Sequence, residues 1–270
     1  MHIVALLATY NEERFIANCL ENLFRQGAEV YLIDNESTDG TVAIAERYRG
    51  RGLIGVETLP RAGVFSLRAQ MQRKEQLAAQ LEADWFIHTD ADEIRLPPCS
   101  GSTLAQALAE VEAEGYNAVN FAEFAFIPTR EAPDHDHPAY LQTMRWYYPF
   151  APAPLHRLNA WRRQRHAVDL TSSGGHQVRF PGARVYPRPF IMKHYLFLSV
   201  PHAIDKFVRR RFDPDEIRMG WHAWRSRLRP EMIRLPCQAE LRPFTSNDEL
   251  DASNPRRTHY LADLIGAQPQ

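Results

Sequence analysis

The stretch Asp84-Trp85-Phe86-Ile87-His88-Thr89-Asp90-Ala91-Asp92-Glu93 decides how this chain is interpreted. An apolar run from Trp85 to Ile87 is followed at once by acidic residues, which is typical of a buried strand that ends in carboxylates. Open α/β sheets bind ligands at that edge. Asp90 and Asp92 would face the same way if the strand continued. Two such carboxylates favour Mg²⁺ or Mn²⁺, although an isolated Asp-x-Asp fits a solvated acidic turn equally well.

Length and composition narrow the class of protein. The chain has 270 residues, of which 44% are hydrophobic and 24% charged, and its net charge is -1. This ordinary globular composition gives no reason to expect a nucleic-acid partner. Three widely separated cysteines, Cys19, Cys99 and Cys237, form neither a disulfide framework nor a zinc pattern, so we expect a reducing, cytoplasmic location. The apolar run 3–8 is too short for a signal peptide or a membrane span.

Strands and helices alternate in the N-terminal third. Strands are predicted at 3–7, 30–33, 55–59 and 85–87, and helices at 15–24, 42–48 and 66–81. Asn11 is expected to cap the first helix and Gly27 to end it. This order predicts an α/β fold with a doubly wound, mostly parallel sheet and helices on both faces.

Three motifs at the ends of the predicted strands resemble those of the family 2 glycosyltransferases of the GT-A fold. They are Ala8–Glu13, Ile33–Thr41 and Asp90-Ala91-Asp92, in the order and spacing of that family. The resemblance covers about residues 1–95. It implies a nucleotide-sugar donor, with a UDP-sugar favoured, and Mn²⁺ or Mg²⁺ held by the Asp-x-Asp motif. It also implies sugar transfer to a carbohydrate or lipid-linked acceptor, as in surface polysaccharide or glycolipid synthesis.

The nucleoside pocket is expected on the first two motifs. Thr9, Tyr10 and Glu12 lie on the first strand-to-helix loop, where an aromatic ring can stack on a base and a carboxylate can accept hydrogen bonds from ribose. Asp34 ends the second strand and can accept the imide N–H of the base. Asp39 is either a helix cap or a second contact to the base.

The diphosphate and metal contacts come next. Arg68 is either a cation for the diphosphate or an ordinary residue of a helix surface. We expect Asp92 to bridge metal and diphosphate, and Asp90 to contact the ribose or an outer-shell water. The resemblance implies that a late histidine completes the metal site, and His194 matches it, although a hydrogen-bonded core histidine is the alternative.

The catalytic base stays open, because the acidic pair that supplies it in many relatives is not evident after residue 95. The candidates are Glu123, Asp169 and His176. Glu123 ranks first, since a carboxylate that interrupts the apolar strand 116–126 needs a partner or a function. A salt-bridged structural residue is the alternative. Whether the reaction inverts or retains the anomeric configuration is open for the same reason.

The chain changes character after residue 95. We expect residues 1–200 to form the GT-A domain, with a nucleotide-sugar-binding half 1–95 and an acceptor and catalytic half 96–200. Residues 201–270 are expected to form a helical extension with a polar tail. Prolines within 129–154 predict a long loop over the site. Two basic helices, 200–211 and 216–229, fit an acceptor, a phosphate or peripheral contact with the inner face of a membrane, and solvated helices are the alternative.

Three other functions share parts of this pattern. A haloacid-dehalogenase-type phosphatase also has Asp-x-Asp after a strand, but on its first strand. A sugar-nucleotide pyrophosphorylase should carry a glycine-rich loop where residues 8–13 have none. A non-catalytic nucleotide-sugar-binding module would need a broken metal site.

Overall fold

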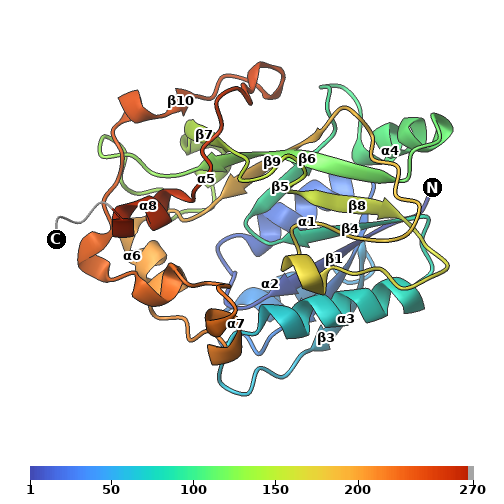
Figure 1. Cartoon of the computed structure of the whole chain (residues 1–270), viewed down its shortest axis with the longest axis horizontal. Coiled ribbons are helices and arrows are strands. Elements are labelled where there is room, and N and C mark those ends of the chain that lie inside the picture. The colour runs from blue at the N-terminus through green and yellow to red at the C-terminus, as the bar shows by residue number, and fades with distance from the viewer. Residues whose placement is uncertain (267–270) are drawn as a thin grey trace. The chain divides into compact units, whose positions relative to one another are not determined.

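The computed structural model describes residues 1–266 (Figure 1). By its internal contacts the chain divides into two compact units. Unit 1 comprises Met1–Arg61, Leu67–Ala122 and Leu155–Met192. Unit 2 comprises Ala62–Ser66, Glu123–Pro154 and the chain from Lys193 onward. The functional division predicted at residues 95 and 200 stays a prediction.

Unit 1 contains the predicted alternation of strands and helices. Its elements are β1 (Ile3–Thr9), α1 (Ile16–Arg25), β2 (Glu29–Asp34), α2 (Thr41–Glu46), β3 (Leu53–Thr58), α3 (Leu67–Gln80), β4 (Trp85–Asp90), β5 (Glu93–Leu96), α4 (Leu104–Ala113), β8 (Leu158–Arg162) and the 3₁₀ helix η1 (Thr171–Ser173). Two strands, β6 (Ala118–Phe126) and β9 (Phe190–Tyr195), begin in unit 1 and end in unit 2.

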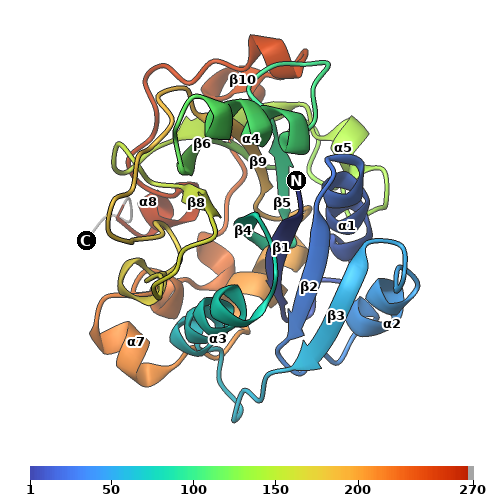
Figure 2. The same ribbon diagram turned by 90° about the vertical axis from the view of Figure 1, so that its right-hand side faces the viewer.

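The sheet of unit 1 has four parallel strands in the order β3-β2-β1-β4, and β8 and β6 extend it in antiparallel pairing beyond β4. The chain moves outward from β1 to β3 and then returns to place β4 on the other side of β1. Right-handed crossovers therefore put α1 and α2 on one face and α3 on the other, as Figure 2 shows. The predicted doubly wound α/β fold is confirmed.

The return of the chain between β1 and β4 creates a topological switch point, where open α/β sheets bind ligands. Register places the predicted polar residues at this edge. Ala8 lies opposite Asp90, and Thr9 lies opposite Asp34. The ends of β1, β2 and β4 therefore reach one edge of the sheet together.

Burial of apolar side chains explains why the first elements form where they do. Every residue of β1 is buried, which is expected of a parallel strand covered on both faces. Helix α1 buries a stripe at helical spacing, formed by Ile16, Cys19, Leu20 and Leu23. Each such aliphatic side chain stabilises the fold by roughly 1.5–3 kcal/mol. Gly27, with a φ of +83°, ends the helix as predicted.

Unit 2 is built from shorter pieces. Its elements are α5 (Tyr140–Thr143), β7 (Trp146–Phe150), α6 (Val200–Ala203), the π-helix η2 (Ile204–Val208), α7 (Pro214–Arg218), the 3₁₀ helices η3 (Arg225–Arg227), η4 (Pro230–Met232), η5 (Gln238–Glu240) and η6 (Asn247–Glu249), β10 (Arg242–Pro243) and α8 (Tyr260–Gly266). Its core is aromatic, with Phe126 and Tyr195 stacked at a centroid distance of 4.9 Å.

Two predictions about unit 2 are wrong. The expected loop 129–154 contains β7, which pairs antiparallel with β6. Only Trp146 and Tyr147 of β7 pair with β10. Pro149 lies beyond these two residues, and its missing N–H is tolerated there because β10 does not reach it. The expected helix 216–229 is interrupted, because Gly220 and His222 have left-handed φ values of +87° and +57°. The short helix α8 lies near the end of the described chain, within the expected polar tail.

The last residues of the predicted polar tail, 267–270, lie outside the described residues. Among residues 1–266, no helix has both the length and the apolar composition needed to cross a bilayer.

Candidate active site

The loops after β1, β2 and β3 are joined by backbone hydrogen bonds. Asn35 N donates to Thr9 O at 2.8 Å, and Leu59 N donates to Asp34 O at 2.8 Å. The side chain of Asn35 then donates to Leu59 O, also at 2.8 Å. These contacts hold the three strand ends as one rigid rim at the carboxyl edge of the sheet.

Asn11 closes this rim and does not cap α1, whose N-cap position is taken by Phe15. Its φ of +56° is left-handed, a conformation that asparagine tolerates better than most residues. Its N–H donates to Ser37 Oγ at 2.9 Å, and its side-chain oxygen accepts from Thr38 N at 2.8 Å. Asn11 therefore joins the first motif to the second.

The two aspartates of the second motif have different surroundings. Asp34 is buried, and its Oδ2 accepts from Ser37 N at 2.9 Å, while its Oδ1 lies 3.4 Å from Thr9 Oγ1. Asp39 accepts from Thr41 N at 2.9 Å and from Glu13 N at 3.1 Å. Gly40 holds the N-cap position of α2, so Asp39 receives the bond from Thr41 N at the residue before the cap, and its other oxygen ties the first motif to the second. The contacts to a base predicted for both residues stay predictions.

The other residues predicted for the nucleotide lie on the same rim or on α3. Glu12 is buried, and its N–H donates to Thr41 Oγ1 at 2.8 Å. Tyr10 is half-buried and carries the guanidinium of Arg61 over its ring. Arg68 is exposed on α3. Their predicted ligand contacts are not tested by this arrangement.

The acidic stretch forms a turn rather than a continuing strand. β4 ends at Asp90 and β5 begins at Glu93, with Asp92 in the turn between them. The buried carboxylate of Glu93 closes the turn, because its Oε2 accepts from Asp90 N at 3.0 Å and from Thr89 Oγ1 at 3.1 Å. Asp92 is buried, whereas 48% of the Asp90 side chain is exposed. The turn, not strand alternation, sets the directions of Asp90 and Asp92.

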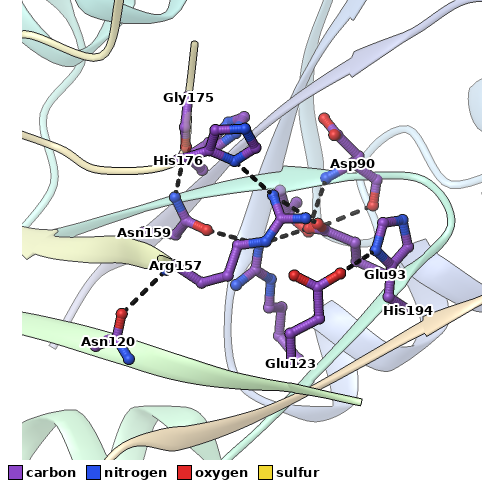
Figure 3. A network of polar contacts seen from close by, with 12 residues as sticks. Asp90, Glu93, Asn120, Glu123, Arg157, Asn159, Gly175, His176 and His194 are labelled. Atoms are coloured by element: carbon purple, nitrogen blue, oxygen red, sulfur yellow. Dashed lines mark hydrogen bonds and ion pairs between the residues drawn. The ribbon is translucent and has the colours of Figure 1, made fainter. Parts of the chain in front are cut away.

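Glu93 is also the centre of a buried ionic network (Figure 3). Arg95 Nη2 lies 2.5 Å from Glu93 Oε2 and donates to Asn159 Oδ1 at 3.1 Å. Arg157 Nη1 lies 4.0 Å from Glu93 Oε1. These residues were not predicted from the sequence, although Glu93 and Arg95, two positions apart in an otherwise apolar strand, indicate paired charges on one face.

Lys74 supplies a further buried cation beneath the acidic turn. Its Nζ lies 2.7 Å from His88 Nδ1, donates to Thr89 O at 3.0 Å and lies 3.8 Å from Asp90 Oδ1. Burial lowers the pKa of Lys74 to about 8, while Asp90 and Glu93 act to raise it. Burial and the neighbouring cations lower the pKa of His88, so its neutral ring accepts at Nδ1.

The loop around Gly174 and Gly175 is pinned in place. Asn159 Nδ2 donates to Gly175 O at 2.7 Å (Figure 3). Glu75 Oε1 accepts from Leu170 N at 2.7 Å and from Thr171 N at 2.8 Å. A Cβ at Gly175 would lie 2.8 Å from His88 Nε2, so glycine permits the loop to approach β4 closely.

Two of the three candidate bases have contacts that suit them poorly to that role. Arg157 Nη1 lies 3.3 Å from His176 Nδ1, and since arginine can only donate, the proton of His176 lies on Nε2. Burial raises the pKa of Asp169, but hydrogen bonds from Ser172 outweigh it and leave that pKa lowered. A base needs a pKa nearer the working pH.

Glu123 and His194 form a pair in unit 2, with His194 Nδ1 2.6 Å from Glu123 Oε1 (Figure 3). Both side chains are largely buried. The acid that interrupts the apolar strand therefore has a partner, which is His194. When Nδ1–H donates to the carboxylate, the ring's lone pair lies on Nε2, as in histidines that bind metals or accept protons. Among residues 1–266, no group of three or more histidine, cysteine or acidic side chains is arranged to hold a metal ion.

The close approach at Gly175 gives a first prediction. We expect Gly175→Ala to lower the free energy of unfolding by about 2–4 kcal/mol, because left-handed strain is joined by a clash with His88 and Met71. The control is Gly182→Ala, which has a φ of +75° but no atom within 4 Å of the new Cβ, and should cost only about 1 kcal/mol. Urea unfolding measures both, and equal losses would contradict the packing argument.

Lys74 gives a prediction about pH. Its folded-state pKa of about 8 is below the ordinary value of 10.5, so between these values the unfolded chain binds the extra proton. Stability should therefore rise with pH above 8, by at most about 1.4 kcal/mol per unit from this residue. In Lys74→Met this contribution disappears. Denaturant titrations from pH 7.5 to 9.5 compare the two slopes, and parallel profiles would show that Lys74 does not titrate there.

Comparisons with known proteins match the N-terminal part of the chain. The family model described as glycosyl transferase family 2 matches residues 5–127. The lipopolysaccharide core biosynthesis glycosyltransferase LpsC of Rhizobium meliloti (strain 1021) is 31% identical over 106 residues, which are 39% of this chain and 36% of that protein. The chain thus spans about a third of the length of this relative.

Two solved structures are similar in part. TarS residues 1–349 of S. aureus in complex with UDP gives a TM-score of 0.47 at 16% identity, over 73% of this chain and 61% of that one. Glucosyl-3-phosphoglycerate synthase of Mycobacterium tuberculosis, in complex with Mn²⁺, UDP and glucosyl-3-phosphoglycerate, gives a TM-score of 0.32 at 20% identity, over 46% of this chain and 44% of that one.

The matched segment begins in β1, contains all three motifs and ends just after β6. Over residues 5–127, this chain is therefore similar to glycosyl transferase family 2.

Proposed function

We propose that this protein is a metal-dependent glycosyltransferase that moves a sugar from a nucleotide-sugar donor, a UDP-sugar in the favoured case, to an acceptor hydroxyl. The observation that carries the proposal is the register of the parallel strands. It brings Thr9, Asp34 and Asp90 to the switch-point edge of the sheet, inside the segment that matches the family. Polar side chains at that edge are what a nucleotide ligand requires.

In this proposal the rim of unit 1 binds the nucleoside. Tyr10 offers a ring for stacking, and Asp34 Oδ1, whose contact to Thr9 is long at 3.4 Å, accepts the imide N–H of the base. Glu12 and Asp90 are the proposed partners of the ribose hydroxyls. The rigid backbone bonds between the three strand ends support the proposal, because a preformed pocket costs less entropy on binding.

The charges at the acidic turn are the argument for a metal. Lys74, Arg95 and Arg157 supply three positive charges, and Asp90, Asp92 and Glu93 supply three negative ones. A diphosphate adds negative charge to this balanced set. Two carboxylates with substrate phosphates are the usual ligands of Mg²⁺, and Mn²⁺ has the same preference for oxygen. We propose Asp92 as the protein ligand. When bound, the metal would offset the charge that develops on the leaving diphosphate.

The acceptor side of the proposal rests on unit 2. Glu123 is the proposed base, with His194 hydrogen bonded to it, and His194 is also the proposed late metal ligand through Nε2. Sugar transfer to a carbohydrate or a lipid-linked acceptor is supported by the name of LpsC, which describes lipopolysaccharide core biosynthesis. Peripheral contact with a membrane and a cytoplasmic location stay predictions.

The metal ligand can be tested by calorimetry. We expect UDP binding to require Mn²⁺ and to weaken at least tenfold in Asp92→Asn, because the amide keeps the shape but loses the charge that holds the ion. The matched control is Asp84→Asn, an exposed aspartate just before β4 and so at the end of that strand away from the acidic turn, which should bind UDP normally. Undiminished metal-dependent binding by the Asp92 variant would refute its role.

The base can be tested by transfer kinetics. Glu123→Gln should keep UDP affinity but lower transfer to the true acceptor by roughly 10²–10⁴-fold, the usual contribution of general-base catalysis. Hydrolysis of the donor by water is the internal control, since it does not need the acceptor's proton to be removed by this residue. Near-normal transfer would move the role to His176 or Asp169, and lost UDP binding would mean that Glu123 contacts the donor.

A further inference from the structure

Two cations lie beside one phenylalanine ring in unit 2. Lys193 Nζ is 4.9 Å from the centroid of the Phe244 ring, and the guanidinium carbon of Arg145 is 5.1 Å from the same centroid. None of these residues has a role in the function proposed above. Two like charges held near one another repel, and an aromatic ring offsets such charge far less than an anion does.

No carboxylate balances this pair. Among residues 1–266, neither Lys193 nor Arg145 forms an ion pair. Burial lowers the pKa of Lys193, the charge of Arg145 lowers it further, and no acidic group acts in the other direction. The other buried lysine differs in this respect, because Asp90 and Glu93 act to raise the pKa of Lys74. The charge of Lys193 and Arg145 is therefore left for a ligand to neutralise.

Arg145 is held in place by neutral groups. Its Nη2 donates to Phe244 O at 2.7 Å and lies 3.4 Å from Thr245 O, while Phe244 N donates back to Arg145 O at 2.7 Å. These carbonyl groups fix the guanidinium without cancelling its charge. Its Nε and Nη1 have no hydrogen-bond partner in the described part of the chain. Arg145 is exposed and Lys193 half-buried, so a solute can reach both.

Tyr195 adds a polar group to the same cluster. It lies two residues after Lys193 in β9, and alternate residues of a strand share a face. Its side chain is fully buried, and its hydroxyl has no hydrogen-bond partner within residues 1–266. Burial raises the pKa of this hydroxyl, and the charge of Arg145 acts to lower it, which places Arg145 near both side chains. An anion, or a water bound to it, would give the hydroxyl a partner.

The cluster lies on the face of β6 and β9 opposite to the Glu123–His194 pair. Lys193 and His194 are consecutive in β9, so their side chains point to opposite faces. The ring of Phe126 contacts that of Phe244 at a centroid distance of 5.5 Å. Phe126 follows Glu123 by three residues in β6, where the pairing with β7 is regular, so these two side chains are also on opposite faces. The cluster is thus separate from the proposed catalytic pair.

We propose that Lys193 and Arg145 form a binding site for a phosphate monoester. The two positive charges match a group that carries nearly two negative charges at neutral pH, whereas a carboxylate would balance only one of them. Its three outer oxygens can accept from the ammonium and from the guanidinium at once. A soluble sugar phosphate and a lipid headgroup that ends in a phosphate share this chemistry. The inference is independent of the proposed donor site.

Two measurements at low ionic strength test the site, with divalent metal left out. Calorimetric titration with glycerol 3-phosphate probes a soluble ester, and sedimentation with phosphatidylcholine vesicles, with or without phosphatidic acid, probes the same group on a lipid. Lys193→Met and Arg145→Ala should each weaken binding at least about tenfold, as expected for the loss of a hydrogen bond to a charged group. Binding in the titration alone identifies a soluble ligand, and sedimentation with phosphatidic acid alone identifies a lipid.

The matched control is Arg51→Ala, which removes an exposed guanidinium that also lies over an aromatic ring, 5.7 Å from that of Tyr48. It should bind both probes as the unsubstituted protein does, whereas an equal loss would show that only overall charge matters and would overturn the site. Binding of neither probe would overturn it as well, as would unchanged binding by Lys193→Met.

Stability provides a second criterion. Lys193→Met should not lower the free energy of unfolding in urea, because it removes a largely buried charge that has no counterion in the described chain. Weaker phosphate binding at undiminished stability supports a binding role, and a clear loss of stability would mean that Lys193 is structural. If Arg145→Ala fails to fold, Lys193→Met decides by the same criteria.

Discussion

The acidic turn depends on one buried carboxylate. Glu93 is 1% exposed, and its cost is offset because Arg95, Thr89 and the N–H of Asp90 all donate to the same oxygen. Breaking such a pair from one side typically costs about 3–5 kcal/mol, since the remaining charge stays buried. Asp90 and Asp92, which the proposed chemistry needs, are thus oriented by a neighbour with no proposed contact to substrate.

A second constraint reaches the turn from α3. Lys74 lies on the buried face of that helix, between Met71 and Leu77, where an apolar residue would normally stand. Its ammonium binds His88, Thr89 and Asp90 in one place, so helix, strand and turn are held to one another by charge. Gly175 then packs against the other ring nitrogen of His88. The region beneath the acidic turn is therefore polar and tightly packed at once, which suits a site that must hold its geometry.

Local patterns predicted much of unit 1 and little of unit 2. Continuous apolar runs identified β1, β2 and β4, and the motifs at their ends identified Thr9, Asp34 and Asp90, because strand direction alone brings these ends together. Lys74, Arg95 and Arg157 were missed, since each reads as a surface charge until distant residues bury it. β7 was not predicted because three prolines in this segment indicate a loop. The strand forms because it pairs with β6, which lies in another part of the sequence. Asn11 was misassigned because a helix cap and a left-handed loop residue favour the same amino acid.

The hydrogen bonds of three histidines indicate which ring nitrogen carries the proton, which the sequence alone could not show. Lys74, protonated at neutral pH, donates to His88 Nδ1, and Arg157 donates to His176 Nδ1, so both rings carry their proton on Nε2. His194 has the opposite arrangement, because its Nδ1 faces the carboxylate of Glu123. In a neutral His194 ring this contact places the proton on Nδ1 and the lone pair on Nε2. The buried Glu123 would stabilise a positive charge placed on that ring, which is what the proposed role of His194 requires.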